Sequence, residues 1–341
     1  MENVVLINDI KIGTNLPVVI IAEAAVEHLG SLEVAKCMVD AAKDAGADII
    51  KFQMHLPDKE MLPGSIKFWG GNMDEVLKRY NLSINQHQEL IKYCNEKQIQ
   101  YLCTPFCSFA ADILDELGVP AFKIGSGEMT NIPMLRHIAK KNKPMIVSTG
   151  MATFEELEET VLVLKSEGVP LILTNCTSIY PPSYSQINLG LIPQFKKKFN
   201  LLVGHSDHTP DIWTALGAAV MGAVVIEKHF TISRRMKGPD SEVSLEPHEF
   251  KLMVEGIRKI ELAMGSEMCV YPEEEIVRNW AHHSVVSLKS ISKGTKITED
   301  MVGVKRPGNG IPAKKISEVI GSYAKLNIEK DILINWKDIS K

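Results

Sequence analysis

This chain of 341 residues has no long apolar run and no long basic run. No stretch approaches the ~18 consecutive apolar residues that a membrane-spanning helix requires. The formal net charge is −4 and no long basic run is present, so a nucleic acid is not an expected partner. Residues 1–4 lack the basic-then-apolar layout of a secretory signal. We therefore expect a cytoplasmic protein that makes no contact with a membrane.

The cysteines form no pattern that indicates disulfides or a zinc site. All six are scattered and lie mostly within apolar runs, as is typical of reduced, buried thiols in the cytosol. Cys103 and Cys107 flank a short Thr-Pro-Phe segment, but no second cysteine pair completes a zinc site. A P-loop signature is also absent, so a nucleotide is not indicated. The apolar fraction of 45% and the charged fraction of 23% are ordinary for a globular protein.

Short β-type apolar runs alternate with amphipathic segments over the first two-thirds of the chain. Helical spacing is clear in residues 32–45, 154–164 and 213–221. Ser31 and Gly46 supply start and stop signals for the first of these helices. Strand alternating with helix predicts a parallel sheet with right-handed crossovers, and eight repeats within ~250 residues predict a closed (β/α)₈ TIM barrel. The eight runs are 18–22, 49–52, 101–103, 121–124, 145–147, 171–173, 201–203 and 223–226.

The character of the chain changes after residues 250–264, which we expect to form the last barrel helix. A polar stretch with three consecutive glutamates follows and reads as a linker. Beyond it the pattern is one of short strands and turns. Residues 291–297 are loosely echoed by 328–334, which indicates a small, internally two-fold domain. We predict a barrel domain over 1–268, a linker over 269–283 and a small domain over 284–341.

Two histidines each follow closely on an apolar run. His208 stands in Gly-His-Ser-Asp-His-Thr after residues 201–203, and His229 stands in Glu-Lys-His-Phe after residues 224–226. Neighbouring parallel strands deliver such residues to the same edge of a sheet, where barrel enzymes build their sites. Imidazole is the commonest side-chain ligand of divalent transition metals. We therefore predict that His208 and His229 hold a metal ion at the mouth of the barrel.

Lysines and hydroxyl groups stand at the ends of other strands. Lys51 and Lys123 are cations delivered from inside a sheet, an unfavourable place without an anion to meet. Hydroxyl donors accompany them, and the Gly-Ser-Gly segment 125–127 can present backbone N–H groups. Together these groups predict a phosphate pocket. In the alternative interpretation, both lysines pair with Glu23 and Glu128. The hydroxyl donors are Thr104, Ser126, Ser148 and Ser206.

A phosphate pocket beside a metal ion held by two histidines limits the reactions that we expect. The metal would polarise an aldehyde oxygen as a Lewis acid, while the lysines hold a phosphorylated three-carbon partner. Glu23, at the end of the first apolar run, would act as a general base or acid close to the metal.

A series of short motifs runs almost from end to end of the chain. They are Ile21-Ala22-Glu23, His28 to Gly30, Ile50 to Gln53, Thr104 to Phe106, Lys123 to Glu128, Ser148 to Met151, Cys176 to Pro181, Ser206 to Thr209, Glu227 to Phe230, Gly238 to Asp240 and Lys305 to Gly310. Each motif alone is a weak signal, but together and in order they are highly specific. By these motifs the chain resembles the sialic acid synthase family, which includes N-acetylneuraminate, legionaminate and pseudaminate synthases.

This resemblance implies a TIM barrel followed by an antifreeze-like domain (SAF, β-clip), in a homodimer with swapped C-terminal domains. It implies condensation of phosphoenolpyruvate with an open-chain N-acylated amino sugar, N-acetylmannosamine or a 2,4-diacetamido-6-deoxy hexose. The products would be a nine-carbon nonulosonic acid, which is an α-keto acid, and phosphate released by C–O cleavage. The metal held by His208 and His229 would be Mn²⁺, with Mg²⁺ or Co²⁺ as alternatives.

The same resemblance assigns roles to individual side chains. Glu23 would act in catalysis together with His208 and His229. Arg306 of the partner subunit would reach over the mouth of the barrel towards the N-acyl group. The residues expected to bind substrate are Lys51, Gln53, Thr104, Lys123, Ser126, Glu128, Ser148, Ser178, Tyr180, Ser206, Asp240 and Arg306.

One segment departs from the pattern of the family. The usual run after the first strand is Gly-x-Asn-His, and here it is Ala25-Val26-Glu27-His28. Ala25 lacks the backbone freedom of glycine, and Glu27 adds a carboxylate where we expect the sugar, so the identity of the sugar stays open. Two other functions also stay open. They are a Schiff-base aldolase that uses Lys123 as its nucleophile and a non-catalytic carbohydrate-binding protein.

Overall fold

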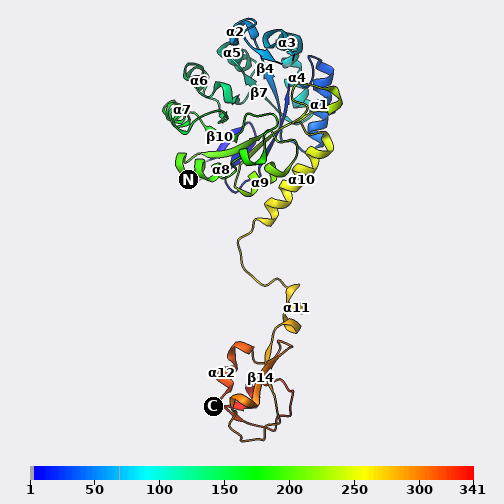
Figure 1. The fold of residues 1–341 in the computed structure, drawn as a ribbon, viewed down its shortest axis with the longest axis vertical. Coiled ribbons are helices and arrows are strands. Elements are labelled where there is room, and N and C mark those ends of the chain that lie inside the picture. The colour runs from blue at the N-terminus through cyan, green and yellow to red at the C-terminus, as the bar shows by residue number, and fades with distance from the viewer. Residues whose placement is uncertain (1–3, 69) are drawn as a thin grey trace. The chain divides into compact units, whose positions relative to one another are not determined.

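The computed structural model describes residues 4–68 and 70–341, so the N-terminal residues 1–3 considered above lie outside the described part. The chain forms two compact units, Met1–Met264 and Gly265–Lys341 (Figure 1). This division falls just before the predicted end of the barrel domain. It assigns the predicted linker to the second unit.

Eight parallel strands form the centre of the first unit, which confirms the predicted barrel. The sheet has the order β7-β4-β3-β12-β11-β10-β9-β8, and β7 also lies beside β8, so the strands close into a ring. All seven backbone-paired neighbours among these strands are parallel. The strands are β3 (Val19–Ala25), β4 (Ile49–Met54), β7 (Gln100–Pro105), β8 (Phe122–Ile124), β9 (Met145–Ser148), β10 (Leu171–Cys176), β11 (Leu202–Asp207) and β12 (Val225–His229).

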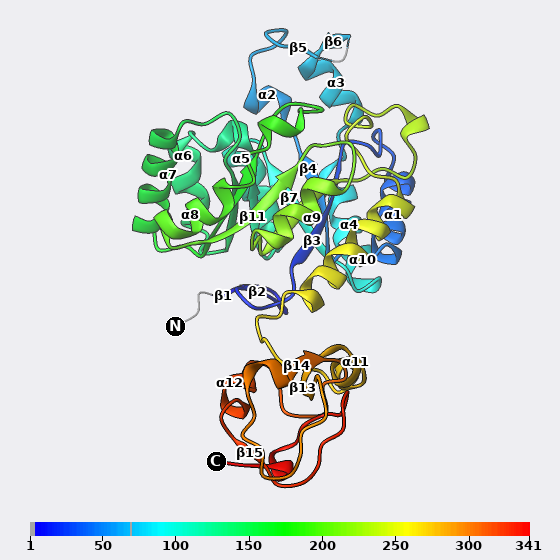
Figure 2. The same ribbon diagram turned by 60° about the horizontal axis from the view of Figure 1, so that its bottom comes forward.

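Helices between the strands surround the barrel (Figure 2). Capping residues in the sequence fix where several of these helices begin. Ser31 accepts a hydrogen bond from Val34 N at the start of the first of them, and Ser83 and Thr153 complete capping boxes on two others. The helices are α1 (Leu32–Asp44), α4 (Ile84–Glu96), α5 (Ser108–Glu116), α6 (Ile132–Ala139), α7 (Phe154–Ser166), α8 (Leu191–Phe199), α9 (Trp213–Val220) and α10 (Pro247–Ala263), with short 3-10 turns η1 (Ser126–Glu128), η2 (Tyr184–Gln186) and η3 (Arg234–Met236).

The apolar core of the barrel unit has two layers, because neighbouring residues of a strand face opposite sides of the sheet. Ile20 of β3 packs in the outer layer against the helices, whereas Val19 and Ile21 pack in the inner layer inside the barrel. An N-terminal hairpin of β1 (Val4–Ile7) and β2 (Ile10–Gly13) adds its apolar side chains to the inner layer. This hairpin therefore closes the end of the barrel opposite the carboxyl ends of the strands (Figure 2).

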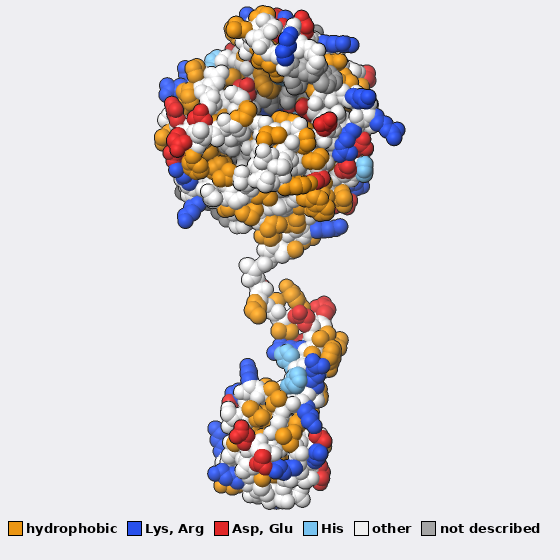
Figure 3. Space-filling view, in the orientation of Figure 1, with side chains coloured by type: hydrophobic (Ala, Val, Ile, Leu, Met, Phe, Trp, Pro, Cys, Tyr) orange, Lys and Arg blue, Asp and Glu red, His pale blue; other side chains and the backbone are white. Residues whose placement is uncertain are grey.

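An insertion follows β4 on the same side as the carboxyl ends of the strands (Figure 2). It contains α2 (Pro57–Glu60), β5 (Lys67–Phe68), β6 (Gly71–Asn72) and α3 (Met73–Tyr80). In the described residues, no helix of either unit has the length and apolar character needed to cross a membrane. On the face drawn in Figure 3, acidic and basic side chains are interspersed.

The second unit is built from short strands and turns, as predicted. Its small core contains Ile291 and Ile328, which form an antiparallel bridge and so join the two segments that echo each other in the sequence. The stretch predicted as a linker contains a helix, α11. The elements are α11 (Glu274–Ala281), β13 (Ser284–Ser287), η4 (Glu299–Met301), β14 (Val302–Lys305), η5 (Ala313–Lys315), α12 (Ile316–Val319), β15 (Tyr323–Ala324), η6 (Trp336–Asp338) and β16 (Ile339–Ser340).

Candidate active site at the mouth of the barrel

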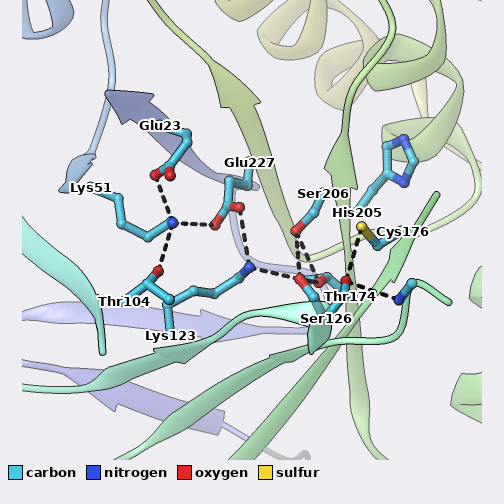
Figure 4. Close-up of polar contacts among 12 residues, drawn as sticks. Glu23, Lys51, Thr104, Lys123, Ser126, Thr174, Cys176, His205, Ser206 and Glu227 are labelled. Carbon is cyan, nitrogen blue, oxygen red and sulfur yellow. Dashed lines mark hydrogen bonds and ion pairs between the residues drawn. The ribbon is translucent and has the colours of Figure 1, made fainter. Parts of the chain in front are cut away.

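The two predicted cations lie within one buried polar cluster (Figure 4). Lys51 Nζ is 2.6 Å from Glu23 Oε2 and donates a hydrogen bond of 2.9 Å to Thr104 Oγ1. Lys123 Nζ donates to Ser148 Oγ at 2.7 Å. Both lysine side chains are almost fully buried, with 3% and 4% of their surface exposed. Two ammonium groups from strands β4 and β8 are therefore held inside the barrel.

Glu227 joins the two lysines and was not among the residues predicted to bind substrate. Its Oε1 is 3.1 Å from Lys123 Nζ, and its Oε2 is 3.8 Å from Lys51 Nζ. The interpretation in which the lysines pair with Glu23 and Glu128 is thus half correct, because Glu227 takes the place of Glu128. The two carboxylates stabilise the two buried ammonium groups. A buried lysine without such a partner would be unfavourable.

Three hydroxyl groups continue the cluster beyond Lys123. Ser148 Oγ lies 3.0 Å from Thr174 Oγ1 and 3.3 Å from Ser206 Oγ, and Ser206 donates to Thr174 at 2.9 Å. All three side chains are buried, so each hydroxyl is satisfied by its neighbours. Thr174 closes this ring. It was not predicted, although it directly follows the apolar run 171–173 as the predicted Ser148 follows 145–147. The ring is a set of donors that can turn towards an anion.

Glu23 combines burial with two hydrogen-bonding neighbours. Besides Lys51, it accepts a hydrogen bond of 2.8 Å from Gln53 Nε2. Burial raises the pKa of Glu23 to about 7, although the Lys51 ammonium opposes the shift. A carboxyl group with a pKa near neutrality can exchange a proton with a substrate at physiological pH. Its position and its pKa therefore suit the general acid or base predicted from the sequence.

The Gly-Ser-Gly segment places Ser126 at the edge of the cluster. Its Oγ accepts a hydrogen bond from Gly150 N at 3.1 Å and lies 3.5 Å from Cys176 Sγ. Glycine is required at position 150, because an added Cβ would lie 2.3 Å from Ser178 Oγ. Burial raises the pKa of the nearby Glu128 to about 7. The predicted residues Ser126 and Ser178 thus both lie beside Gly150.

The two predicted metal ligands lie side by side. The ring centres of His208 and His229 are 5.2 Å apart, and the ring of Tyr180 is 4.2 Å and 5.7 Å from them. Asp240 Oδ2 is 3.7 Å from His229 Nδ1. The cluster of lysines is connected to this pair, because Cys176 Sγ lies 3.9 Å from His208 Nδ1. The imidazoles and the ammonium groups therefore share one rim of the barrel.

The chemistry of the two histidines fits a divalent metal with open positions. His208 Nδ1 is 2.7 Å from Thr177 O, an acceptor that fixes the proton on Nδ1 and leaves Nε2 with a free lone pair. His229 Nδ1 is buried and has no hydrogen-bond partner among the described residues. Burial lowers the pKa of His229 well below its usual range, so the ring stays neutral as a ligand must. Within the described parts of the chain, no three His, Cys, Asp or Glu side chains converge as a closed metal cage.

Charged residues directly before the histidines face away from the mouth. Asp207 Oδ2 and Lys228 Nζ form an ion pair of 2.9 Å between β11 and β12, and both side chains are completely buried. Thr214 of α9 donates to the same carboxylate at 2.7 Å, and Thr209 N donates to its other oxygen at 2.9 Å. This pair joins the two strand ends that carry His208 and His229.

Arg306 belongs to the second unit. Its Nε donates a hydrogen bond of 3.0 Å to Ala281 O, and its guanidinium group lies 5.6 Å from the centre of the Trp280 ring. Within that unit the arginine thus contacts the last turn of α11. The remaining predicted residues, from Glu23 to Asp240, all belong to the barrel unit.

Comparison with known proteins identifies the family. The NeuB family matches residues 38–268, and the SAF domain matches residues 282–340. The chain belongs to the NeuB family. It is 40% identical to the N,N'-diacetyllegionaminic acid synthase of Campylobacter jejuni over 92% of this chain and 98% of that protein. It is 33% identical to the N-acetylneuraminate-9-phosphate synthase of Homo sapiens over 94% of this chain and 92% of that protein.

A solved structure agrees with both the family and the fold. The N-acetylneuraminic acid synthetase from Leptospira borgpetersenii, crystallised with citrate, is 33% identical to this NeuB family member, with a TM-score of 0.74. The match covers 81% of this chain and 95% of the other. The predicted sialic acid synthase family and the barrel followed by an SAF domain are thereby confirmed.

Proposed function

We propose that this protein is a nonulosonic acid synthase. It condenses phosphoenolpyruvate with an open-chain N-acylated amino sugar, either N-acetylmannosamine or a 2,4-diacetamido-6-deoxy hexose. One observation carries this proposal: two buried ammonium groups and a neighbouring pair of imidazoles lie at one end of a barrel whose relatives are synthases of sialic, legionaminic and pseudaminic acids.

Phosphoenolpyruvate binds at the lysine cluster. Lys51 and Lys123 face its negative charges, and the hydroxyl groups of Thr104, Ser148 and Ser206 turn to donate to its oxygens. Ser126 lies at the edge of the same cluster. Glu23 and Glu227 neutralise the two cations before the anion arrives.

The sugar binds above His208 and His229, facing Gln53, Glu128, Ser178, Tyr180 and Asp240. The two histidines would hold the metal, Mn²⁺ or a similar ion, and the ion would supply Lewis acidity to polarise the aldehyde oxygen. C3 of phosphoenolpyruvate attacks the aldehyde carbon, and positive charge develops at C2. Glu23 stabilises that charge and takes a proton from the water that adds to C2. The former aldehyde oxygen takes up the proton that the water gave to Glu23 and becomes a hydroxyl group. Phosphate then leaves with the bridging oxygen and the proton of the C2 hydroxyl group, and C2 becomes a ketone.

The direct test is to mix the protein with Mn²⁺, phosphoenolpyruvate and each candidate sugar, and to measure phosphate. We expect release that depends on both the sugar and the metal. With ¹⁸O in the bridging position, the label should appear in the phosphate. The variant His208→Ala should lose Mn²⁺ binding and turnover together, whereas His137→Ala, a half-exposed histidine paired with Asp112, should keep both. Absence of phosphate with every sugar would contradict the proposal.

Two other functions give different results in the same assays. A Schiff-base aldolase would be trapped by borohydride in the presence of pyruvate and would remain active in EDTA. The contacts of Lys123 disfavour it, because this ammonium pairs with Glu227 and donates to Ser148. A carbohydrate-binding protein would keep its affinity for sugar in His208→Ala and would release no phosphate.

A further inference from the structure

The carboxylate of Glu27 lies away from the lysine cluster and contacts a different loop. Glu27 follows β3, and its side chain is fully buried. Its Oε1 accepts a hydrogen bond of 2.8 Å from the backbone N–H of Asp240. Its Oε2 is buried without a hydrogen-bond partner in the described residues. Glu27 therefore binds the segment 238–240 across a sequence separation of 213 residues.

The two ends of that loop are anchored without Glu27. Leu245 N donates to His229 O at 2.8 Å, and Thr231 N donates to Leu245 O at 3.0 Å. Asp240 lies between these ends, and within the loop its backbone O accepts hydrogen bonds from Val243 N at 3.1 Å and Ser244 Oγ at 2.8 Å. Its carboxylate is 3.7 Å from His229 Nδ1, so its position matters for whatever binds at the imidazole pair. The hydrogen bond from its N–H to Glu27 is a tether that reaches the barrel wall.

The lack of a side chain at Gly238 allows the Glu27 carboxylate to lie against the backbone of the loop. A Cβ at Gly238 would be 2.3 Å from Glu27 Oε1 and 2.4 Å from Oε2. The backbone at Gly238 does not require glycine, because its φ lies outside the positive range. Crowding by the carboxylate is thus the obstacle to a side chain there.

We infer that Glu27 is a positioning residue: it holds the 238–240 loop so that Asp240 faces the imidazole pair, and it thereby tunes affinity for the sugar but not for phosphoenolpyruvate. This inference rests on the proposed function, which identifies the two substrates as the sugar and phosphoenolpyruvate. The contact between Glu27 and Gly238 is tested independently of that function.

The experiment is a double-variant cycle with Glu27→Ala, Gly238→Ala and their combination. Loss of one hydrogen bond to a carboxylate should raise KM for the sugar about tenfold in Glu27→Ala, with KM for phosphoenolpyruvate within about twofold of wild type. Gly238→Ala displaces the carboxylate and should raise KM for the sugar similarly. The double variant should be no worse than Glu27→Ala, because the added methyl group then meets no carboxylate. Glu27→Gln keeps an acceptor for Asp240 N–H and should restore KM for the sugar to within about twofold.

Thermal unfolding tests the contact between Glu27 and Gly238 without any substrate. Gly238→Ala should lower Tm in the wild-type background and leave it unchanged in the Glu27→Ala background. Gly190→Ala is the matched control, because an added Cβ there meets no atom within 4 Å and φ is −60°. The inference is overturned if Gly238→Ala lowers Tm equally in both backgrounds, or if Glu27→Ala raises KM for both substrates equally. Wild type could release no phosphate while Gly238→Ala lowers Tm only when Glu27 is present. In that case the proposed function fails, but the contact between Glu27 and the 238–240 loop is still supported.

Discussion

The buried ion pair between Asp207 and Lys228 offers a test of how the rim is held together. In Lys228→Met the ammonium is lost, and the Asp207 carboxylate stays buried beside the N–H and hydroxyl groups of Thr209, the hydroxyl of Thr214 and, at 3.8 Å, the ring of His205. Breaking a buried pair from one side costs about 3–5 kcal/mol. For a unit of this size each kcal/mol lowers Tm by about 2–4 °C. We therefore expect the Tm of the barrel unit to fall by about 10 °C.

The assay is calorimetric or circular-dichroism melting of the full chain, with an exposed ion pair as control. Lys78 Nζ lies 2.7 Å from Asp58, with side chains 47% and 71% exposed, so Lys78→Met should cost less than about 1 kcal/mol. Adding Asp207→Asn to Lys228→Met removes the uncompensated charge and should recover much of the loss. The two residues directly precede the histidines, so Lys228→Met should also weaken binding of Mn²⁺. Equal melting of Lys228→Met and Lys78→Met would refute this reasoning.

Three further predictions follow from single residues. Ala25 has φ of +45°, a conformation that favours glycine, so Ala25→Gly should raise the free energy of unfolding in urea by about 1 kcal/mol. Burial raises the pKa of Glu27 from 4.5 to about 7, so the folded state binds this proton more tightly. Wild type should therefore lose about 3 kcal/mol of stability relative to Glu27→Gln as the pH rises from 4.5 to 7; parallel pH profiles would contradict this. Thr174→Val opens the hydroxyl ring and should raise KM for phosphoenolpyruvate about tenfold, whereas Thr160→Val, a buried threonine bonded to Met129 O, should leave it unchanged.

The strands were predictable from the sequence, but their ends were not. The apolar run 201–203 predicts one strand, whereas β11 spans Leu202–Asp207. Its pairing with β10 continues through His205 and Ser206, opposite Asn175 and Cys176. Backbone hydrogen bonds continue where polar side chains face the mouth of the barrel, so hydropathy alone underestimates the length of the strand. The N-terminal hairpin went unrecognised for a related reason, because four-residue strands carry too little periodicity.

Roles within the candidate site depended on contacts that the sequence does not contain. Glu227 and Glu128 both stand beside a predicted strand end, and only the structure shows that Glu227 is the carboxylate between the lysines. Thr174 directly follows the apolar run 171–173, as Ser148 follows 145–147, so its place at a strand end was a signal that the sequence analysis missed. Glu27 was expected near the sugar, and only the structure shows that its carboxylate binds the backbone of Asp240, itself a predicted sugar-binding residue.

The alternation of side chains along a strand explains how this rim combines reactive groups with structural support. On β12, Glu227 points to the lysines inside the barrel, Lys228 points outward to Asp207, and His229 points inward again. On β11, Ser206 joins the hydroxyl ring while Asp207 packs behind it against α9. Consecutive polar residues thus serve opposite sides of the same sheet. An ion pair behind the barrel wall can hold the imidazoles in place without occupying the cavity where two substrates must meet.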